Sequence, residues 1–408
     1  MNVPFFRSIY SKEERLFDMI YMDNAATTRM SKEVFDAMTP YMMDQFANAA
    51  GTYGFASKST EAMEKARKQI ARVIGAKSAE IFFTSGGTES DNWALKGAAK
   101  AYAAKGKHII TSAIEHHAIL HTCDALKKDG FDVTVLPVDE FGKVDPAAVE
   151  AAIRPDTILV SIMAANNEIG TVQPLKEIGE ITKKHGVLFH TDAVQAFAHI
   201  PMNVDEMNID LLSASAHKFH GPKGVGILYI RKGVRLVSFM DGGAQEKRRR
   251  AGTSNVPGIV GMGAAAEIAM ANMDEAIEKV SAVRDHLIAR ISAEIPHCRL
   301  NGHPTDRLPG NVNFCFRFIE GEGMLMLLDA NGICASSGSA CTSGSLDPSH
   351  VLLAIGLPHE IAHGSLRLSL CEETTMEQAD FVVDSLKTII PRLRSMSPLY
   401  EDFVRANG

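Results

Sequence analysis

The chain has 408 residues, with 42 lysines and arginines against 49 aspartates and glutamates, which gives a formal net charge of −7 at pH 7. Hydrophobic residues make up 46% and charged residues 22%, values ordinary for a globular protein of two or three domains. The mild acidity and the lack of a basic stripe argue against a nucleic-acid partner.

The six cysteines are scattered, and none forms a CxxC pair: Cys123, Cys298, Cys315, Cys334, Cys341 and Cys371. This spacing predicts neither a disulfide framework nor a zinc ribbon. Charged residues interrupt the first 28 residues, which excludes the apolar core of a signal peptide, and no uncharged run reaches the roughly 18 residues of a membrane span. We therefore expect a cytoplasmic protein with reduced thiols and no membrane partner.

Short apolar segments alternate with amphipathic stretches between residues 81 and 230. Seven segments are predicted strands: 81–84, 108–111, 132–137, 158–163, 187–190, 211–215 and 226–230. Helical patterns lie between several of them, at 89–104, 117–129, 146–153 and 175–185. Strands rich in Val, Ile and Leu, separated by helices of this length, predict an α/β fold with a mainly parallel seven-stranded sheet covered on both faces.

The last third of the chain has a less regular pattern. Two helices, 259–272 and 275–295, are expected to lead out of the first domain, and the segments 310–318 and 324–331 and a C-terminal helix at 376–396 follow. This order predicts a second, smaller α+β domain. We expect residues 36–272 to form the large domain, and residues 1–35 together with 273–408 to form the small one.

The first motif that carries chemistry is the turn Ser85-Gly86-Gly87-Thr88-Glu89-Ser90, which follows a predicted strand and opens a helix. Glycines allow a tight turn, and the free N–H groups of a helix N-terminus suit a phosphate. The turn lacks the GK[ST] ending of a P-loop, which argues against a nucleoside triphosphate. Taken alone, a purely structural turn is the slightly better interpretation.

Two further motifs also follow predicted strands. Asp192 is expected at the crevice where α/β proteins bind ligands, although alone it is equally compatible with a helix cap. Lys218 follows His217 and precedes Gly221 and Pro222. A desolvated lysine amine forms Schiff bases with carbonyl groups, whereas alone a basic surface loop would be preferred. Together and in this order, the three motifs predict binding of pyridoxal phosphate (PLP), whose ring nitrogen an aspartate keeps protonated.

The segment 335–345, ASSGSACTSGS, consists of small and polar residues without an apolar period. This composition predicts a mobile loop, and a cysteine within it is accessible, unlike a buried thiol. Cys341 is therefore the one cysteine expected to act chemically, and the other five are expected in the core.

Two other patterns are expected to have no catalytic or ligand-binding role. Residues 261–266 match the letters of a dinucleotide fingerprint, but they lie inside an Ala-rich helical run, which favours close helix packing. His117 and His121 lie four residues apart without the acidic residue of a metalloprotease motif, so no metal site is predicted.

These motifs resemble those of the cysteine desulfurases of the NifS/IscS type. The resemblance extends from about Tyr21 to the end of the chain. Its further motifs are DNAATT (23–28), Glu115-His116, NNEIG (166–170), RAGT (250–253), PSHVL (348–352) and SLRLS (365–369). It implies the PLP-dependent transferase fold type I, PLP as cofactor, L-cysteine as substrate and a homodimer.

The resemblance also implies roles, carried over by matching position. Lys218 would form the Schiff base, Asp192 would pair with the ring nitrogen, and His116 would stack on the ring and move protons. The implied phosphate ligands are Gly87, Thr88, Ser215, His217 and, from the second subunit, Thr253. Gln195 and Asn167 would lie near the ring hydroxyl, and Arg367, with Asn167 nearby, would bind the substrate carboxylate.

The implied reaction leaves L-alanine and a persulfide on Cys341, whose sulfur goes to iron–sulfur cluster assembly through a NifU/IscU-like scaffold. Two alternatives remain. Another PLP enzyme of the same fold, such as a selenocysteine lyase or an aminotransferase, is disfavoured by the Cys341 loop, because transamination needs no mobile thiol. A non-catalytic sulfur carrier is disfavoured by Lys218.

Overall fold

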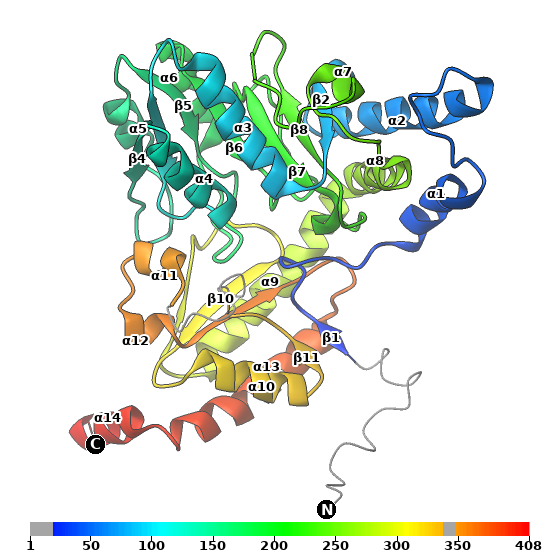
Figure 1. Cartoon of the computed structure of the whole chain (residues 1–408). Coiled ribbons are helices and arrows are strands. Elements are labelled where there is room, and N and C mark those ends of the chain that lie inside the picture. Colours follow the sequence, from blue (N-terminus) through cyan, green and yellow to red (C-terminus); the bar gives the residue numbers. More distant parts are fainter. Residues whose placement is uncertain (1–18, 338–347, 408) are drawn as a thin grey trace, which may run out of the picture.

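The computed structural model describes residues 19–337 and 348–407, and Figure 1 shows their arrangement. The largest sheet contains β2 (Ile81–Thr84), β3 (His108–Ser112), β4 (Asp132–Leu136), β5 (Thr157–Ser161), β6 (Leu188–Asp192), β7 (Leu211–Ser215) and β8 (Gly226–Ile230). The strands lie in the order β2-β8-β7-β6-β5-β3-β4. All seven predicted strands are confirmed, with ends that differ by no more than one or two residues.

Most neighbours in this sheet are parallel, as predicted, but β8 runs antiparallel to both β2 and β7. The direction of β8 was not predicted, because a fully buried strand is a continuous apolar run in either orientation. Ser215 at the end of β7 pairs with Gly226 at the start of β8. The loop that connects these two paired strands therefore lies at the carboxyl ends of the parallel strands, and it contains Lys218.

Helices cover both faces of the large sheet, as predicted (Figure 1). The helices of this part of the chain are α1 (Lys32–Met43), α2 (Gly54–Val73), α3 (Gly87–Tyr102), α4 (His117–Lys128), α5 (Pro146–Ala152), α6 (Leu175–His185), α7 (Gln245–Arg248) and α8 (Val256–Ala271), of which α1 packs on α8. Consecutive strand residues enter different cores. Ile109 and Leu211 pack with α3 and α4, whereas Ile110 and Leu212 pack with α2, α6 and α8.

Helix α8 is apolar because it is buried against α1 and α2. A Cβ atom on Gly261 would lie 2.5 Å from Met38 Sδ, and one on Gly263 would lie 2.6 Å from Ala66 Cα. The helices approach so closely that only glycine fits, which confirms the packing interpretation of this segment. Among the described helices none alone is long and apolar enough to cross a membrane; α8 and α9 (Met273–Glu294) satisfy that test only as a pair, which is bent by 75°.

A smaller α+β unit follows, shown below the large sheet in Figure 1. Its sheet has the order β12-β10-β9, from β9 (Cys298–Leu300), β10 (Asn311–Phe316) and β12 (Ser365–Ser369). Its helices are α9, α10 (Gly321–Ala330), α11 (His350–Ala354), α12 (His359–Ala362), α13 (Met376–Arg394) and α14 (Pro398–Asn407). The N-terminal strand β1 (Ile20–Tyr21) pairs in parallel with β11 (Ile333–Cys334).

The smaller unit has its own core. Met22, from the N-terminal segment, packs in one cluster with Leu287 of α9, Phe316 of β10 and Leu386 of α13. Residues from the two ends of the chain thus share this core. The boundaries at residues 36 and 272 stay a prediction.

Candidate active site

A cavity of about 380 Å³ lies where the parallel strands of the large sheet end. Asp192 ends β6 and Ser215 ends β7, and both line the cavity. Most of the predicted site residues lie in the same lining: Gly87, Thr88, His116, Asn167, Asp192, Gln195, Ser215, His217, Lys218 and Arg367. Residues that are up to 280 positions apart in the sequence (367 − 87) are therefore brought to one place.

One end of the cavity is formed by the start of helix α3 at Gly87. Within the described part of the chain no side chain caps this helix, so the N–H groups of its first turn remain for a ligand. A Cβ atom on Gly87 would lie 2.5 Å from Val194 Cγ2, which explains the second glycine of the turn. Ser215 and His217 line the same cavity. Free amides and a helix dipole at this end suit an anion.

Lys218 ends the short 3₁₀ helix η2 (Ala216–Lys218) in the loop between β7 and β8. Its Nζ donates hydrogen bonds to the carbonyl oxygens of Ala25 at 2.6 Å and Ala26 at 2.9 Å. Ala216, two residues before it, and Phe219, directly after it, are buried. The loop is thus packed against the protein rather than solvated, and it presents the amine at the cavity wall.

Asp192 is buried, and its Oδ1 accepts a hydrogen bond from the backbone N–H of Val194 at 2.9 Å. Burial raises the pKa of Asp192, although this hydrogen bond and the charge on Lys218 act in the opposite direction. Asp91, one helical turn after Gly87, is also buried in the lining; burial and the Asp192 charge raise its pKa, and its Oδ1 has no hydrogen-bond partner among the described residues. A cationic group in the cavity would favour the ionised form of these carboxyl groups.

Glu115 lies beneath the same region and is fully buried. Its Oε1 accepts hydrogen bonds from Ser112 Oγ at 2.6 Å and from the Met163 backbone N–H at 2.9 Å. Burial nevertheless raises the pKa of Glu115 to about 8.

His116 precedes α4 and caps it, because its Nδ1 accepts a hydrogen bond from the backbone N–H of Ala118 at 3.1 Å. Burial, together with the smaller effect of the charge on Lys218, lowers the pKa of His116 to about 4. The ring is therefore neutral near pH 7, and its proton lies on Nε2. A neutral imidazole with a fixed tautomer thus faces the cavity.

Arg367 reaches the cavity from β12 of the smaller sheet, and its side chain is only 5% exposed. Its Nη1 donates to the Asn167 carbonyl oxygen at 2.9 Å and its Nη2 to Asp23 Oδ1 at 2.9 Å. Its Nε is buried and has no partner among the described residues. A guanidinium held on two sides with an N–H to spare is suited to a carboxylate.

The remaining predicted residues are not in this lining. Thr253 is exposed, and Cys341 lies outside the described residues. Sequence reasoning missed Asp91, although its spacing of four from Gly87 places both on one helix face. It also assigned no role to Asp23, although the motif DNAATT begins at this residue, because its partner Arg367 is 344 residues away.

The residues of the cavity fit PLP. An uncapped helix N-terminus suits its phosphate, a buried carboxylate suits its ring nitrogen, and a lysine amine suits its aldehyde. The fold and this site together define a PLP-dependent enzyme of fold type I.

Comparisons with known proteins agree. The family model of aminotransferase class-V matches residues 20–382. The chain is 58% identical over 380 residues to the cysteine desulfurase IscS of Methanosarcina thermophila (93% of this chain, 94% of the relative), and 56% identical over 389 residues to that of Clostridium botulinum (95% and 98%). A solved NifS-like protein has a TM-score of 0.87 at 40% identity and covers 92% of this chain and 100% of its own. The chain therefore belongs to the class-V aminotransferase family, among the cysteine desulfurases of the NifS/IscS type.

Proposed function

We propose that this protein is a cysteine desulfurase that converts L-cysteine to L-alanine and retains the sulfur as a persulfide on Cys341. One observation carries the proposal: Lys218, Asp192, His116 and Arg367 line the cavity that the uncapped start of α3 closes. The lysine and the aspartate are the pair that PLP chemistry needs, and the arginine adds a site for an amino-acid carboxylate.

The cofactor, when bound, supplies an electron-poor ring conjugated to the substrate amine, which acidifies the substrate Cα–H. The chain supplies the remaining functions. Gly87, Thr88, Ser215 and His217 hold the phosphate, and Thr253 of the second subunit adds to them. Asp192 keeps the ring nitrogen protonated, and Gln195 and Asn167 lie beside the ring hydroxyl.

Lys218 Nζ is the base that takes the Cα proton of the substrate. Its hydrogen bonds to the carbonyl oxygens of Ala25 and Ala26, which also line the cavity, support this role. His116 stacks on the ring, and the proton on its Nε2 is available for transfer. Because its pKa is lowered to about 4, the ring stays uncharged and does not repel the Lys218 ammonium.

Cys341 Sγ, as a thiolate, forms a bond to the substrate sulfur while the carbon–sulfur bond of the substrate breaks. The sulfur is transferred as sulfane sulfur, and the carbon takes a proton to become L-alanine. L-Cysteine and the Cys341 thiol thus give L-alanine and a Cys341 persulfide, with no further reactant. A NifU/IscU-like scaffold then receives the sulfur for iron–sulfur cluster assembly.

A homodimer is supported by apolar side chains at the surface of α1 and the segment after it. Met43 is 75% exposed and Phe46 74%, and Phe35 and Tyr53 are exposed as well. Such a patch suggests a partner surface, and a second copy would also bring its Thr253 to the phosphate end. We also propose a cytoplasmic location, because the five described cysteines are unpaired, as expected in a reducing compartment.

The test measures L-alanine and sulfide together after L-cysteine and a reductant are added to the PLP-loaded enzyme. We expect equal amounts of both products, and Cys341→Ser is expected to retain PLP but to lose sulfide release. Alanine without sulfide would contradict a desulfurase, and preference for selenocysteine would favour the selenocysteine lyase. Borohydride treatment followed by peptide mass analysis should find the cofactor attached to Lys218.

A further inference from the structure

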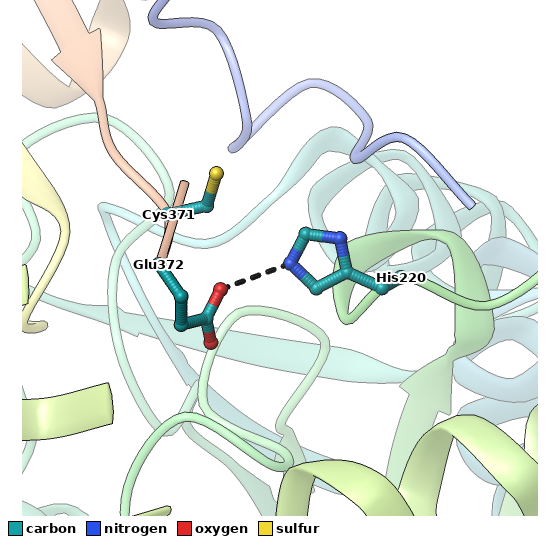
Figure 2. Close-up of side chains that lie close together, drawn as sticks. All are labelled: His220, Cys371 and Glu372. Atoms are coloured by element: carbon teal, nitrogen blue, oxygen red, sulfur yellow. Dashed lines mark hydrogen bonds and ion pairs between the residues drawn. The ribbon is translucent and has the colours of Figure 1, made fainter. Parts of the chain in front are cut away.

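Three side chains with metal-binding atoms meet outside the PLP cavity: His220, Cys371 and Glu372 (Figure 2). His220 Nε2 lies 3.1 Å from Glu372 Oε2, and the nitrogen, sulfur and oxygen atoms all lie within 4.8 Å of one another. No other group of His, Cys, Asp and Glu side chains in the described ranges has this geometry. His220 belongs to the loop between β7 and β8, whereas Cys371 and Glu372 follow β12 of the smaller sheet.

The histidine is held in the orientation that metal ligands have. The backbone N–H of His220 donates to Thr28 Oγ1 at 2.7 Å, and its Nδ1 lies 2.9 Å from the Arg29 carbonyl oxygen. A carbonyl oxygen only accepts, so Nδ1 carries a proton, and Nε2 is the atom directed at the cluster. Hydrogen bonding of the second ring nitrogen to a carbonyl is the usual arrangement around a metal-bound histidine.

The other two ligands are fixed by a tight turn. The backbone N–H of Cys371 donates to Thr374 Oγ1 at 3.1 Å, and the backbone N–H of Thr374 donates to the Cys371 carbonyl at 3.0 Å. Thr375 then caps α13. The turn therefore presents a thiol and a carboxylate from consecutive residues without help from a metal.

The separations suit a tetrahedral ion. Zinc bonds of about 2.0–2.1 Å to nitrogen and oxygen and about 2.3 Å to sulfur place the ligand atoms about 3.3–3.6 Å apart. The His220–Glu372 separation of 3.1 Å is already close to this value, and all three ligand atoms lie within 4.8 Å of one another. His220 and Glu372 also line a cavity of about 330 Å³, through which an ion can enter.

We propose that His220, Cys371 and Glu372 bind one divalent cation of the zinc type, with water as the fourth ligand. The mixture of thiolate, imidazole and carboxylate favours zinc or cobalt over magnesium and calcium, which prefer oxygen ligands. Two protons leave on binding, one from the Cys371 thiol and one from His220 Nε2. Without the ion, an imidazolium–carboxylate pair between His220 and Glu372 joins the same two segments.

The ion acts on the position of active-site residues. His220 is two residues after Lys218, and Cys371 is four residues after Arg367, so the ion ties together the segments that carry the lysine and the arginine. Its ligands do not line the PLP cavity. They are therefore positioning residues, and metal binding stabilises the arrangement of the two sheets.

The test uses PLP-loaded enzyme without added histidine tags, in a Cys341→Ser background that removes the other candidate thiol. After treatment with a chelator and its removal, zinc is titrated against a chromophoric chelator. We expect one zinc per subunit, and His220→Gln, Cys371→Ser and Glu372→Gln should each weaken binding at least about tenfold, since loss of even an outer-shell partner costs that much. Glu373→Gln is the matched control and should bind zinc as the background does.

Cobalt provides a second, independent measurement. Binding of Co²⁺ should produce a sulfur-to-cobalt charge-transfer band that Cys371→Ser lacks. Retention of the visible PLP spectrum shows that a variant is folded. If a variant does not fold, anomalous scattering from zinc-soaked crystals of the background enzyme locates the ion. Absence of tight zinc binding in the background enzyme, or equal binding in all variants, would overturn the proposal.

Discussion

Replacement of Arg367 by lysine tests the proposed carboxylate site most directly. The guanidinium is held by Asn167 and Asp23, and its buried Nε is without a partner among the described residues. We expect the substrate carboxylate to take this N–H and one remaining Nη hydrogen in a bidentate pair. Lysine keeps the charge but loses the planar fork.

The size of the effect follows from the hydrogen bonds lost. A hydrogen bond to a charged group contributes about 1.5–3 kcal/mol, and Arg367→Lys removes at least one of the two. Because about 1.4 kcal/mol corresponds to a factor of ten, kcat/KM for L-cysteine should fall between about tenfold and 150-fold.

The assay compares two ligands in the Cys341→Ser background, where turnover is blocked. Visible titration of the bound cofactor gives the Kd of L-cysteine and of cysteamine, which lacks the carboxylate. Arg367→Lys should weaken L-cysteine binding but leave cysteamine within about twofold. Equal weakening of both would refute the carboxylate role and indicate general damage to the cavity. Asp23→Asn removes the ion pair but keeps the guanidinium. Its Kd for L-cysteine should lie between the values of the parent and of Arg367→Lys.

Two further predictions concern the start of α3 and a buried carboxyl. Gly87→Ala should weaken PLP binding between about fivefold and 150-fold, because its Cβ would lie 2.5 Å from Val194 Cγ2 and overpacking costs about 1–3 kcal/mol. Equilibrium dialysis measures this affinity, and an unchanged value would contradict the close approach. Glu115→Gln should reduce the loss of stability at high pH. The pKa of Glu115 is about 8 in the folded state, above its ordinary value of 4.5. The protonated carboxyl therefore contributes its full stabilisation of the folded parent protein below pH 4.5. This stabilisation is lost as the pH rises, and the loss ends above about pH 8. Between pH 5.5 and 8 the free energy of unfolding of the parent should fall by about 3 kcal/mol more than that of Glu115→Gln. Urea unfolding at several pH values measures this, and the same pH dependence of the unfolding free energy in both proteins would argue against it.

The parts of the fold and site that sequence could predict are local in the chain. The segment that forms β7 is one short apolar run, and Asp192 and Lys218 come at or shortly after the ends of predicted strands. Both the strands and these candidate residues can therefore be recognised from neighbouring positions in the sequence. The glycines at 86 and 87 predicted a tight turn, and the 2.5 Å approach of Val194 gives the physical reason for the second.

What could not be predicted depends on distant pairing. The direction of β8 is set by its neighbours and leaves no trace in its own residues. Asp23 meets Arg367, and His220 meets Glu372, only because the smaller unit folds back on the large sheet. Thr253 and Cys341 stay predictions, since one is proposed to act in a second subunit and the other lies outside the described residues.

The buried carboxyl groups around the cavity affect the stability of the folded chain as well as its chemistry. Besides burial, the charges of Asp192 and Glu115 raise the pKa of Asp91, and the charge of Asp192 also raises that of Glu115, so these carboxyl groups cannot all ionise together at low cost. A bound ligand that carries a positive charge favours their ionised forms and adds its binding free energy to the stability of the folded chain. Newly made chains that find no PLP are therefore more exposed to proteolysis, and the amount of this protein in a cell should follow the supply of vitamin B6 as well as its own synthesis.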